Sequence, residues 1–326
     1  MRPRSARLPS LLRLRTRIAP HLATHVHDRY NSSDFLNSKS ARAIRIMCEY
    51  EEPKMRLESS LGGELNTVLV FASARGKCRA DHDKAVVEAQ AELDALPTDA
   101  PAAEREKAEA WITRLGRLEW QCEFYEKVRA VSRAVAQWGV DRIEEGRPRV
   151  SICSGGGPGL MAAANQGAHD VPGAKSIGMA ISLPFEKGCN PYVDDDLAFE
   201  FHYFFTRKFW MCYPAKALIV APGGFGTCDE LFELITLIQT GKEAPIPIVL
   251  FGKEYWQSVI NWEKFVEYGT VAPRDVARLF FTDSVDEALE HIQVGIAARE
   301  DRRTRSPSFA AAASAHAAAA MAEAQP

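Results

Sequence analysis

The chain has 326 residues, 46% of them hydrophobic and 25% charged, which is enough for one large α/β domain or two small ones. A formal net charge of −3 argues against bulk electrostatic binding of nucleic acid, and no apolar run is long enough to span a membrane. The seven cysteines are scattered without zinc-site spacing, which predicts reduced thiols, no metal and a cytoplasmic location.

The two ends of the chain differ in composition from the middle. Residues 1–27 carry several arginines, a pattern typical of a basic arm or a targeting peptide, and we expect a disordered extension. Residues 301–326 are rich in Ser and Ala and are expected to be disordered too. The folded part is therefore predicted to be residues 28–300. It begins with a polar, partly helical lead-in whose apolar residues are expected to dock on the core: Phe35, Ile44, Ile46, Met47 and Tyr50.

Short apolar runs separated by helical patterns make up the middle of the chain. The runs predict strands at 67–72, 149–154, 176–181, 199–205, 217–221, 246–251 and 278–281. The intervening helices are predicted at 82–138, from Leu160, at 209–213, from Thr227, at 256–265 and at 285–298. This alternation predicts a single α/β domain, a Rossmann-like, doubly wound parallel sheet flanked by helices.

The first long helical stretch is broken at residues 97–101. Its Ala/Glu-rich half, 85–110, favours a solvated helical hairpin or an oligomer contact, within an insertion at 82–118. Beyond it, apolar residues recur every three or four positions from Trp111 to Trp138, which predicts a stripe buried in the core.

The most informative stretch is Lys216–Gly241, which reads as a buried strand, a glycine turn and a helix. Backbone N–H groups at such a turn form a phosphate site without a charged side chain, which points to Gly223, Gly224, Gly226 and Thr227. A second strand–glycine–helix unit follows residue 154, with Gly156 and Gly157 in the turn and Met161 in the helix. It lacks the spacing of a P-loop or a dinucleotide fold, so a purely structural turn stays open.

Both glycine loops and the Ser73 turn are expected at the carboxyl ends of strands, where they would face one crevice. Glu230 has two interpretations. Thr227 and Glu230 match a capping box, which is structural, whereas a carboxylate beside the phosphate would act on the sugar. Arg207 and Lys208 follow a strand end and fit either a surface pair or an anion site.

Two other polar features have structural explanations that we favour. The triplet Asp194–Asp196 fits a solvated turn better than a metal site, because adjacent loop residues seldom converge. His202 alternates with aromatic residues and fits a core or sheet-surface position better than a base.

The motifs described above resemble those of the LOG (Lonely Guy) family. Residues 222–227 followed by Glu230 match its PGGxGTxxE motif, and Arg207-Lys208 match its Arg-Lys pair. Residues 155–161 match its first glycine loop and residues 71–75 its first strand end, so the likeness runs from about Thr67 to Ile292. The chain is most similar to the longer bacterial members, although compact members lack the 82–118 segment.

The resemblance implies a homodimer or higher oligomer that hydrolyses a nucleoside 5′-monophosphate, such as AMP or a cytokinin riboside monophosphate, to free base and ribose 5-phosphate. It assigns catalysis to Arg207 and Glu230. It assigns substrate contacts to Ser73, Gly156, Gly157, Met161, Lys208, Gly223, Gly224, Gly226 and Thr227. Aromatic candidates for stacking on the base are Phe185, Tyr192 and Phe225. No cofactor, metal, nucleic acid or membrane is implied, and the alternative is a nucleotide-binding sensor or carrier without turnover.

Overall fold

The computed structural model describes residues 32–63, 65–183 and 188–305. The predicted arm at 1–27, Phe185 and most of the predicted tail lie outside these residues. The described chain divides into two compact units, the first ending at Cys48 and the second starting at Glu49. In the first unit, α1 (Ser33–Leu36), η1 (Lys39–Ala41) and the start of α2 (Arg42–Leu61) are joined by Arg45, whose Nη1 donates to the Ser38 carbonyl at 2.8 Å.

The second unit is built on one sheet of seven parallel strands in the order β4-β3-β2-β1-β5-β6-β7. The strands are β1 (Thr67–Phe71), β2 (Ser151–Ser154), β3 (Ser176–Ile181), β4 (Ala198–Phe201), β5 (Ala215–Val220), β6 (Ile248–Phe251) and β7 (Leu279–Thr282). The predicted doubly wound parallel sheet is therefore confirmed.

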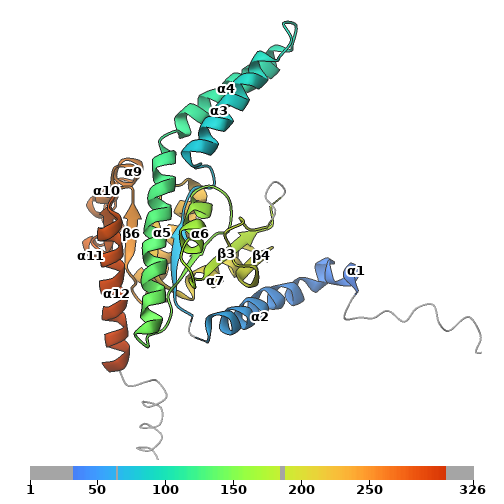
Figure 1. The fold of residues 1–326 in the computed structure, drawn as a ribbon. Helices are drawn as coiled ribbons and strands as arrows, with labels where there is room; N and C mark the ends of the chain where they lie inside the picture. The colour runs from blue at the N-terminus through green and yellow to red at the C-terminus, as the bar shows by residue number, and fades with distance from the viewer. Residues whose placement is uncertain (1–31, 64, 184–187, 306–326) are drawn as a thin grey trace, which may run out of the picture. The chain divides into compact units, whose positions relative to one another are not determined.

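Helices cover both faces of this sheet (Figure 1), and the central strands β1, β2, β5 and β6 place apolar residues in a core on each face. In β1, Val68 and Val70 point into one core and Leu69 and Phe71 into the other. The first core is closed by α5 (Gln121–Glu144), α6 (Leu160–His169) and α12 (Val285–Arg305). The second is closed by the end of α2 and by α7 (Phe204–Cys212), α8 (Phe225–Gln239), α9 (Lys253–Val259), α10 (Trp262–Glu267) and α11 (Pro273–Val276).

The strand order determines where a ligand site lies. From the central strand β1 the chain moves outward through β2, β3 and β4, then returns to the other side of β1 with β5. The sheet therefore reverses its winding between β1 and β5, and the loops after these strands border the crevice in which open α/β sheets bind ligands.

The insertion forms the predicted helical hairpin, α3 (Arg79–Asp94) and α4 (Ala102–Leu118), which projects from the sheet (Figure 1). At its base, buried His82 lies with Nε2 3.0 Å from the Leu115 carbonyl. The predicted buried stripe holds for Leu115, Cys122, Tyr125, Val128, Val131 and Val135, but not for Trp111, which is 40% exposed. The reason is that Trp111 lies in the projecting hairpin, whereas α5 packs on the sheet.

Candidate active site

A cleft of about 680 Å³ lies at the carboxyl ends of β1 and β5. Two loops form its walls, residues 72–75 after β1 and residues 223–227 after β5. Backbone bonds hold the loops together: the Ala221 N–H donates to the Phe71 carbonyl at 2.9 Å, and the Ser73 N–H to the Pro222 carbonyl at 3.1 Å. The motif residues Met161, Arg207 and Glu230 also line the cleft. Other lining residues, among them Tyr255 and Ile260, belong to no motif.

The helix after the second loop begins earlier than predicted. Helix α8 starts at Phe225 with Gly224 as its N-cap and no side-chain cap, so Thr227 is inside the first turn. The predicted capping box of Thr227 and Glu230 is therefore wrong. A Cβ on Gly223 would lie 2.1 Å from Thr227 Oγ1, so only glycine allows this close turn. Because the first N–H groups of a helix have no partner within it, those of residues 225–227 remain available at the cleft that these residues line.

The floor of the cleft is an ion pair between Arg207 and Glu230. Arg207 Nη1 donates to Glu230 Oε1 at 2.8 Å, and the two side chains are only 8% and 14% exposed. Strand β4 ends at Phe201 and α7 begins at Phe204, earlier than predicted. Arg207 therefore lies within α7 rather than in the connection before it. Its Nε donates to the Met179 carbonyl at the end of β3 at 2.7 Å, which fixes the guanidinium plane.

A glycine makes room for this pair. A Cβ on Gly155 would lie 2.5 Å from Arg207 Nη2 and 2.7 Å from Met161 Sδ. The first glycine of the loop after β2 therefore lets the guanidinium pass close to the backbone.

The electrostatics of Glu230 are governed by burial. Desolvation raises the pKa of the carboxyl above its ordinary value of 4.5, while the charge of Arg207 and its hydrogen bond oppose that rise. A buried carboxyl whose raised pKa is opposed by a specific charged partner in a cleft is typical of catalytic sites.

Lys208 is directed away from this pair. Its Nζ lies 2.8 Å from Asp229 Oδ2 and 2.8 Å from Glu233 Oε2, and it lines neither the cleft nor the second cavity described below. Burial by itself would lower the pKa of Lys208, but the hydrogen bonds to Asp229 and Glu233 leave it raised. Lys208 thus holds α7 to α8.

The loop after β2 lies elsewhere than expected. Ser73 and Met161 line the cleft, but Gly156 and Gly157 line a second cavity of about 720 Å³. The segment Ala74-Arg75 lines both and separates them. Gly159, at a φ of 73°, fits tightly against it, because a Cβ there would lie 2.5 Å from the Ala74 carbonyl carbon. The single crevice predicted from the sequence is thus divided in two.

Two aromatic residues of the cleft differ in exposure and in the signal that could have found them. Tyr255 Oη donates to the Gly223 carbonyl at 2.6 Å and so holds the loop from α9. No motif marks Tyr255, and only the folded chain brings it to the loop. Phe225, a predicted stacking residue, is 97% exposed at the rim of the cleft. His202, by contrast, is exposed after β4 and lines neither cavity.

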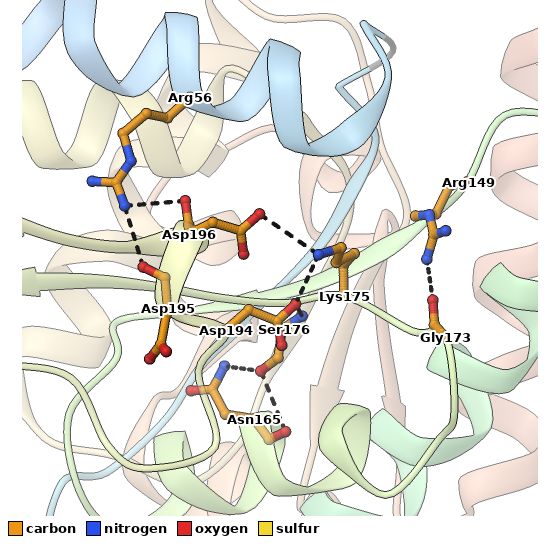
Figure 2. Close-up of polar contacts among 9 residues, drawn as sticks. All are labelled: Arg56, Arg149, Asn165, Gly173, Lys175, Ser176, Asp194, Asp195 and Asp196. Atoms are coloured by element: carbon orange, nitrogen blue, oxygen red, sulfur yellow. Dashed lines mark hydrogen bonds and ion pairs between the residues drawn. The ribbon is translucent and has the colours of Figure 1, made fainter.

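The acidic triplet forms the turn into a short 3-10 helix, η2 (Asp195–Leu197), and is held by cations (Figure 2). Lys175 Nζ lies 3.5 Å from Asp194 Oδ2 and 3.6 Å from Asp196 Oδ2, and Arg56 donates to two carbonyls of the turn. A hydrogen bond from Ser60, with help from Lys175, lowers the pKa of Asp196. Across the described ranges, no three His, Cys, Asp or Glu residues gather as metal ligands. The described part of the chain also contains no helix long and apolar enough to cross a membrane.

Comparison with known proteins finds similarity to the family that the motifs resemble. A family profile described as "Possible lysine decarboxylase" matches residues 161–292. Cytokinin riboside 5′-monophosphate phosphoribohydrolase LOG3 of Arabidopsis thaliana is 32% identical over 126 residues, covering 37% of this chain and 56% of the relative. LOG7 of the same plant is 30% identical over 145 residues, covering 43% and 63%. The chain thus spans less than two thirds of the length of these relatives.

Proposed function

We propose, from the similarity to LOG proteins and from the buried Arg207–Glu230 pair, that the chain is a member of the LOG family that hydrolyses the N-glycosidic bond of a nucleoside 5′-monophosphate. The products are a free base and ribose 5-phosphate. The relatives LOG3 and LOG7 are named for cytokinin riboside 5′-monophosphates, and AMP has the same purine–ribose–phosphate frame. The observation that carries the proposal is the position of Glu230, which lies in the same cleft as the uncapped start of α8.

In this proposal the phosphate binds at the start of α8. The uncapped N–H groups of Phe225, Gly226 and Thr227 donate to its oxygens, and the helix dipole adds about 0.3–2 kcal/mol. Gly223 and Gly224 keep side chains out of the way, and Ser73 closes the site from the β1 loop. This places the sugar over Glu230, one turn further along the helix.

Glu230 then acts on the ribose. Its carboxylate orients the sugar hydroxyls or the attacking water and stabilises the positive charge that develops at C1′ as the C1′–N bond breaks. The water oxygen forms the new C1′–O bond, and its proton goes to the departing base. Arg207 opposes the protonation that burial favours, and its hydrogen bond fixes the direction of the carboxylate.

The alternative chemistry in the family description, lysine decarboxylation, fits these residues poorly. It relies on a pyridoxal group bound to a lysine whose amine is easily deprotonated. No lysine lines the cleft within the described residues, and the nearby Lys208 is held protonated by two carboxylates.

The test incubates the protein separately with AMP, GMP, CMP and isopentenyl-AMP. Chromatography should detect the free base and an equal amount of ribose 5-phosphate from at least one of them. A protein that binds a nucleotide but releases no base would be the sensor or carrier instead. Carbon dioxide release from lysine in the presence of pyridoxal phosphate would restore the decarboxylase interpretation.

We also expect the family's homodimer. Helix α7 and its C-cap support this with exposed aromatic side chains, since Phe204 and Phe205 of the helix and Tyr213 after it are 53%, 57% and 54% exposed. Such exposed aromatic rings are typical of interfaces. Light scattering coupled to size exclusion should give twice the chain mass, and a Phe205→Glu variant should lower it.

A further inference from the structure

The second cavity is a separate chamber with its own walls. It lies beyond Ala74-Arg75, between the loop after β2, residues 188–192 and helix α4 of the hairpin. Its volume of about 720 Å³ is in the range of small-molecule sites. Asn190 holds one wall, because its Nδ2 donates to the Gly156 and Gly157 carbonyls at 3.1 and 3.0 Å.

Unpaired positive charge gathers in this cavity. Arg75, Lys77 and Arg114 line it, and Asp81 is the one acidic residue among the described lining residues. None of these three cations forms an ion pair with a described residue, whereas Arg56, Arg79 and Lys127 on other helices each pair with a carboxylate four residues away. Cations that line one chamber repel one another, so an anion bound between them is favoured.

Aromatic surface lies beside this charge. Trp111 is 40% exposed and lines the cavity, as do Tyr125 and Tyr192. Arg114 Cζ lies 5.7 Å from the Trp111 ring, so cation and ring occupy the same part of the wall. Hydration of the exposed apolar surface of Trp111 is unfavourable in free energy. A flat ring stacked on Trp111 would cover that surface and remove this cost.

A buried acceptor behind the lining is also unsatisfied. Gln121 is 7% exposed, and its Oε1 has no hydrogen-bond partner among the described residues. This oxygen lies 3.0 Å from where a Cβ on Gly76, a lining residue, would be. A buried amide oxygen without a donor is uncommon in folded proteins and indicates a missing partner.

We propose that this second cavity binds a nucleotide, with its phosphates at Lys77, Arg114 and Arg75 and its base against Trp111. Size, charge and ring surface together fit a nucleotide better than inorganic phosphate, which would leave Trp111 uncovered, or an uncharged aromatic, which would leave the cations unpaired. Because Arg75 and Ala74 also border the cleft, a ligand in the second cavity contacts the wall of the first.

The experiment uses 8-azido-ATP as a photolabel on the full chain, followed by proteolysis and peptide mapping. Label is expected in peptides that contain Trp111, Tyr125 or Tyr192, and excess ATP should prevent it. The double variant Lys77→Glu/Arg114→Glu should reduce this labelling at least about tenfold, since two charge contacts become repulsive. The matched control Lys107→Glu/Arg117→Glu makes the same charge change at exposed positions of α4 outside the cavity and should label normally.

The outcomes separate the two sites. Label confined to peptides of residues 223–260 would mean that only the first cleft binds nucleotide and would overturn the proposal, as would no labelling. Equal labelling of the two double variants would overturn the assignment of the phosphates to Lys77 and Arg114. All four substituted side chains are exposed, so circular dichroism should show unchanged folding.

Discussion

Replacing Glu230 by glutamine removes the charge of the carboxylate and little else. The amide oxygen can still accept from Arg207 Nη1, which now donates to Oε1 at 2.8 Å. Losing the charge weakens a charge-assisted bond, at a cost of about 1–3 kcal/mol. A neutral amide is cheaper to bury than a carboxylate, but Arg207 is left as a buried cation without a counter-charge, which keeps the loss toward the upper end of this range. The fold should survive, since domains are stable by about 5–15 kcal/mol.

Activity should respond far more strongly than stability. Loss of a group that stabilises the transition state typically lowers kcat by about 10²-fold or more. Glu233→Gln is a matched control, because Glu233 lies one turn further on α8 and pairs with Lys208 at 2.8 Å outside the cleft. We expect this control to retain at least about half of the wild-type rate, in line with the small contribution of partly exposed ion pairs.

The assay measures free base released from AMP by chromatography, with the thermal midpoint of each variant recorded in parallel. A folded Glu230→Gln protein that hydrolyses AMP at the wild-type rate would refute the role of Glu230. Equal losses in both variants would show that the rate follows the stability of α8 rather than the chemistry of the cleft.

Three further predictions concern the same cleft. Burial raises the pKa of the Glu230 carboxyl, so kcat/KM should fall on acidification with a midpoint above 4.5. The residual activity of Glu230→Gln should lack this fall at acidic pH. The same fall in the variant would exclude Glu230 as its source. Phe225 is 97% exposed, so Phe225→Ala should raise KM about tenfold by loss of stacking without lowering the thermal midpoint, and an unchanged KM would remove the ring from the site. Gly155→Ala brings a Cβ to 2.5 Å from Arg207 Nη2 and should lower activity at least about tenfold. The control Gly116→Ala has open space around it, so it should leave activity unchanged and stabilise α4 by up to about 1 kcal/mol. Full activity of Gly155→Ala would show that the position of the guanidinium is not critical.

The sheet could be predicted because its strands are buried on both faces. Continuous apolar runs such as residues 176–181 stand out in a chain that is otherwise mixed, and β3 has the predicted boundaries. The ends of helices and strands were harder to predict from the sequence. The strand predicted to reach residue 205 stops at Phe201, because the aromatic residues that follow belong to α7, where they lie partly exposed.

Several of the residues that line the cleft were expected from the sequence, whereas Lys208, Gly156 and Gly157 lie outside it. Thr227 and Glu230 have the spacing of a capping box, but the glycines before them place the N-cap at Gly224, three residues earlier, and the sequence alone does not reveal that shift. The separation of Gly156 and Gly157 from the cleft depends on how residues 74–75 pass between the loops. That passage is a tertiary feature with no local signature. The roles of the site residues remain predictions.

The central position of β1 has a consequence for how the chain assembles. Thr67 pairs with Ser151 on one side and Ala215 on the other, so the middle strand has to wait for partners made much later during synthesis. Contacts of such long sequence separation slow folding, because a long loop must close before they form. The α3–α4 hairpin consists of local contacts and can form long before the sheet. The two loops that hold the Arg207–Glu230 cleft belong to strands that meet late, so a chain cut short before residue 215 would expose β1 as an unpaired edge, prone to aggregation.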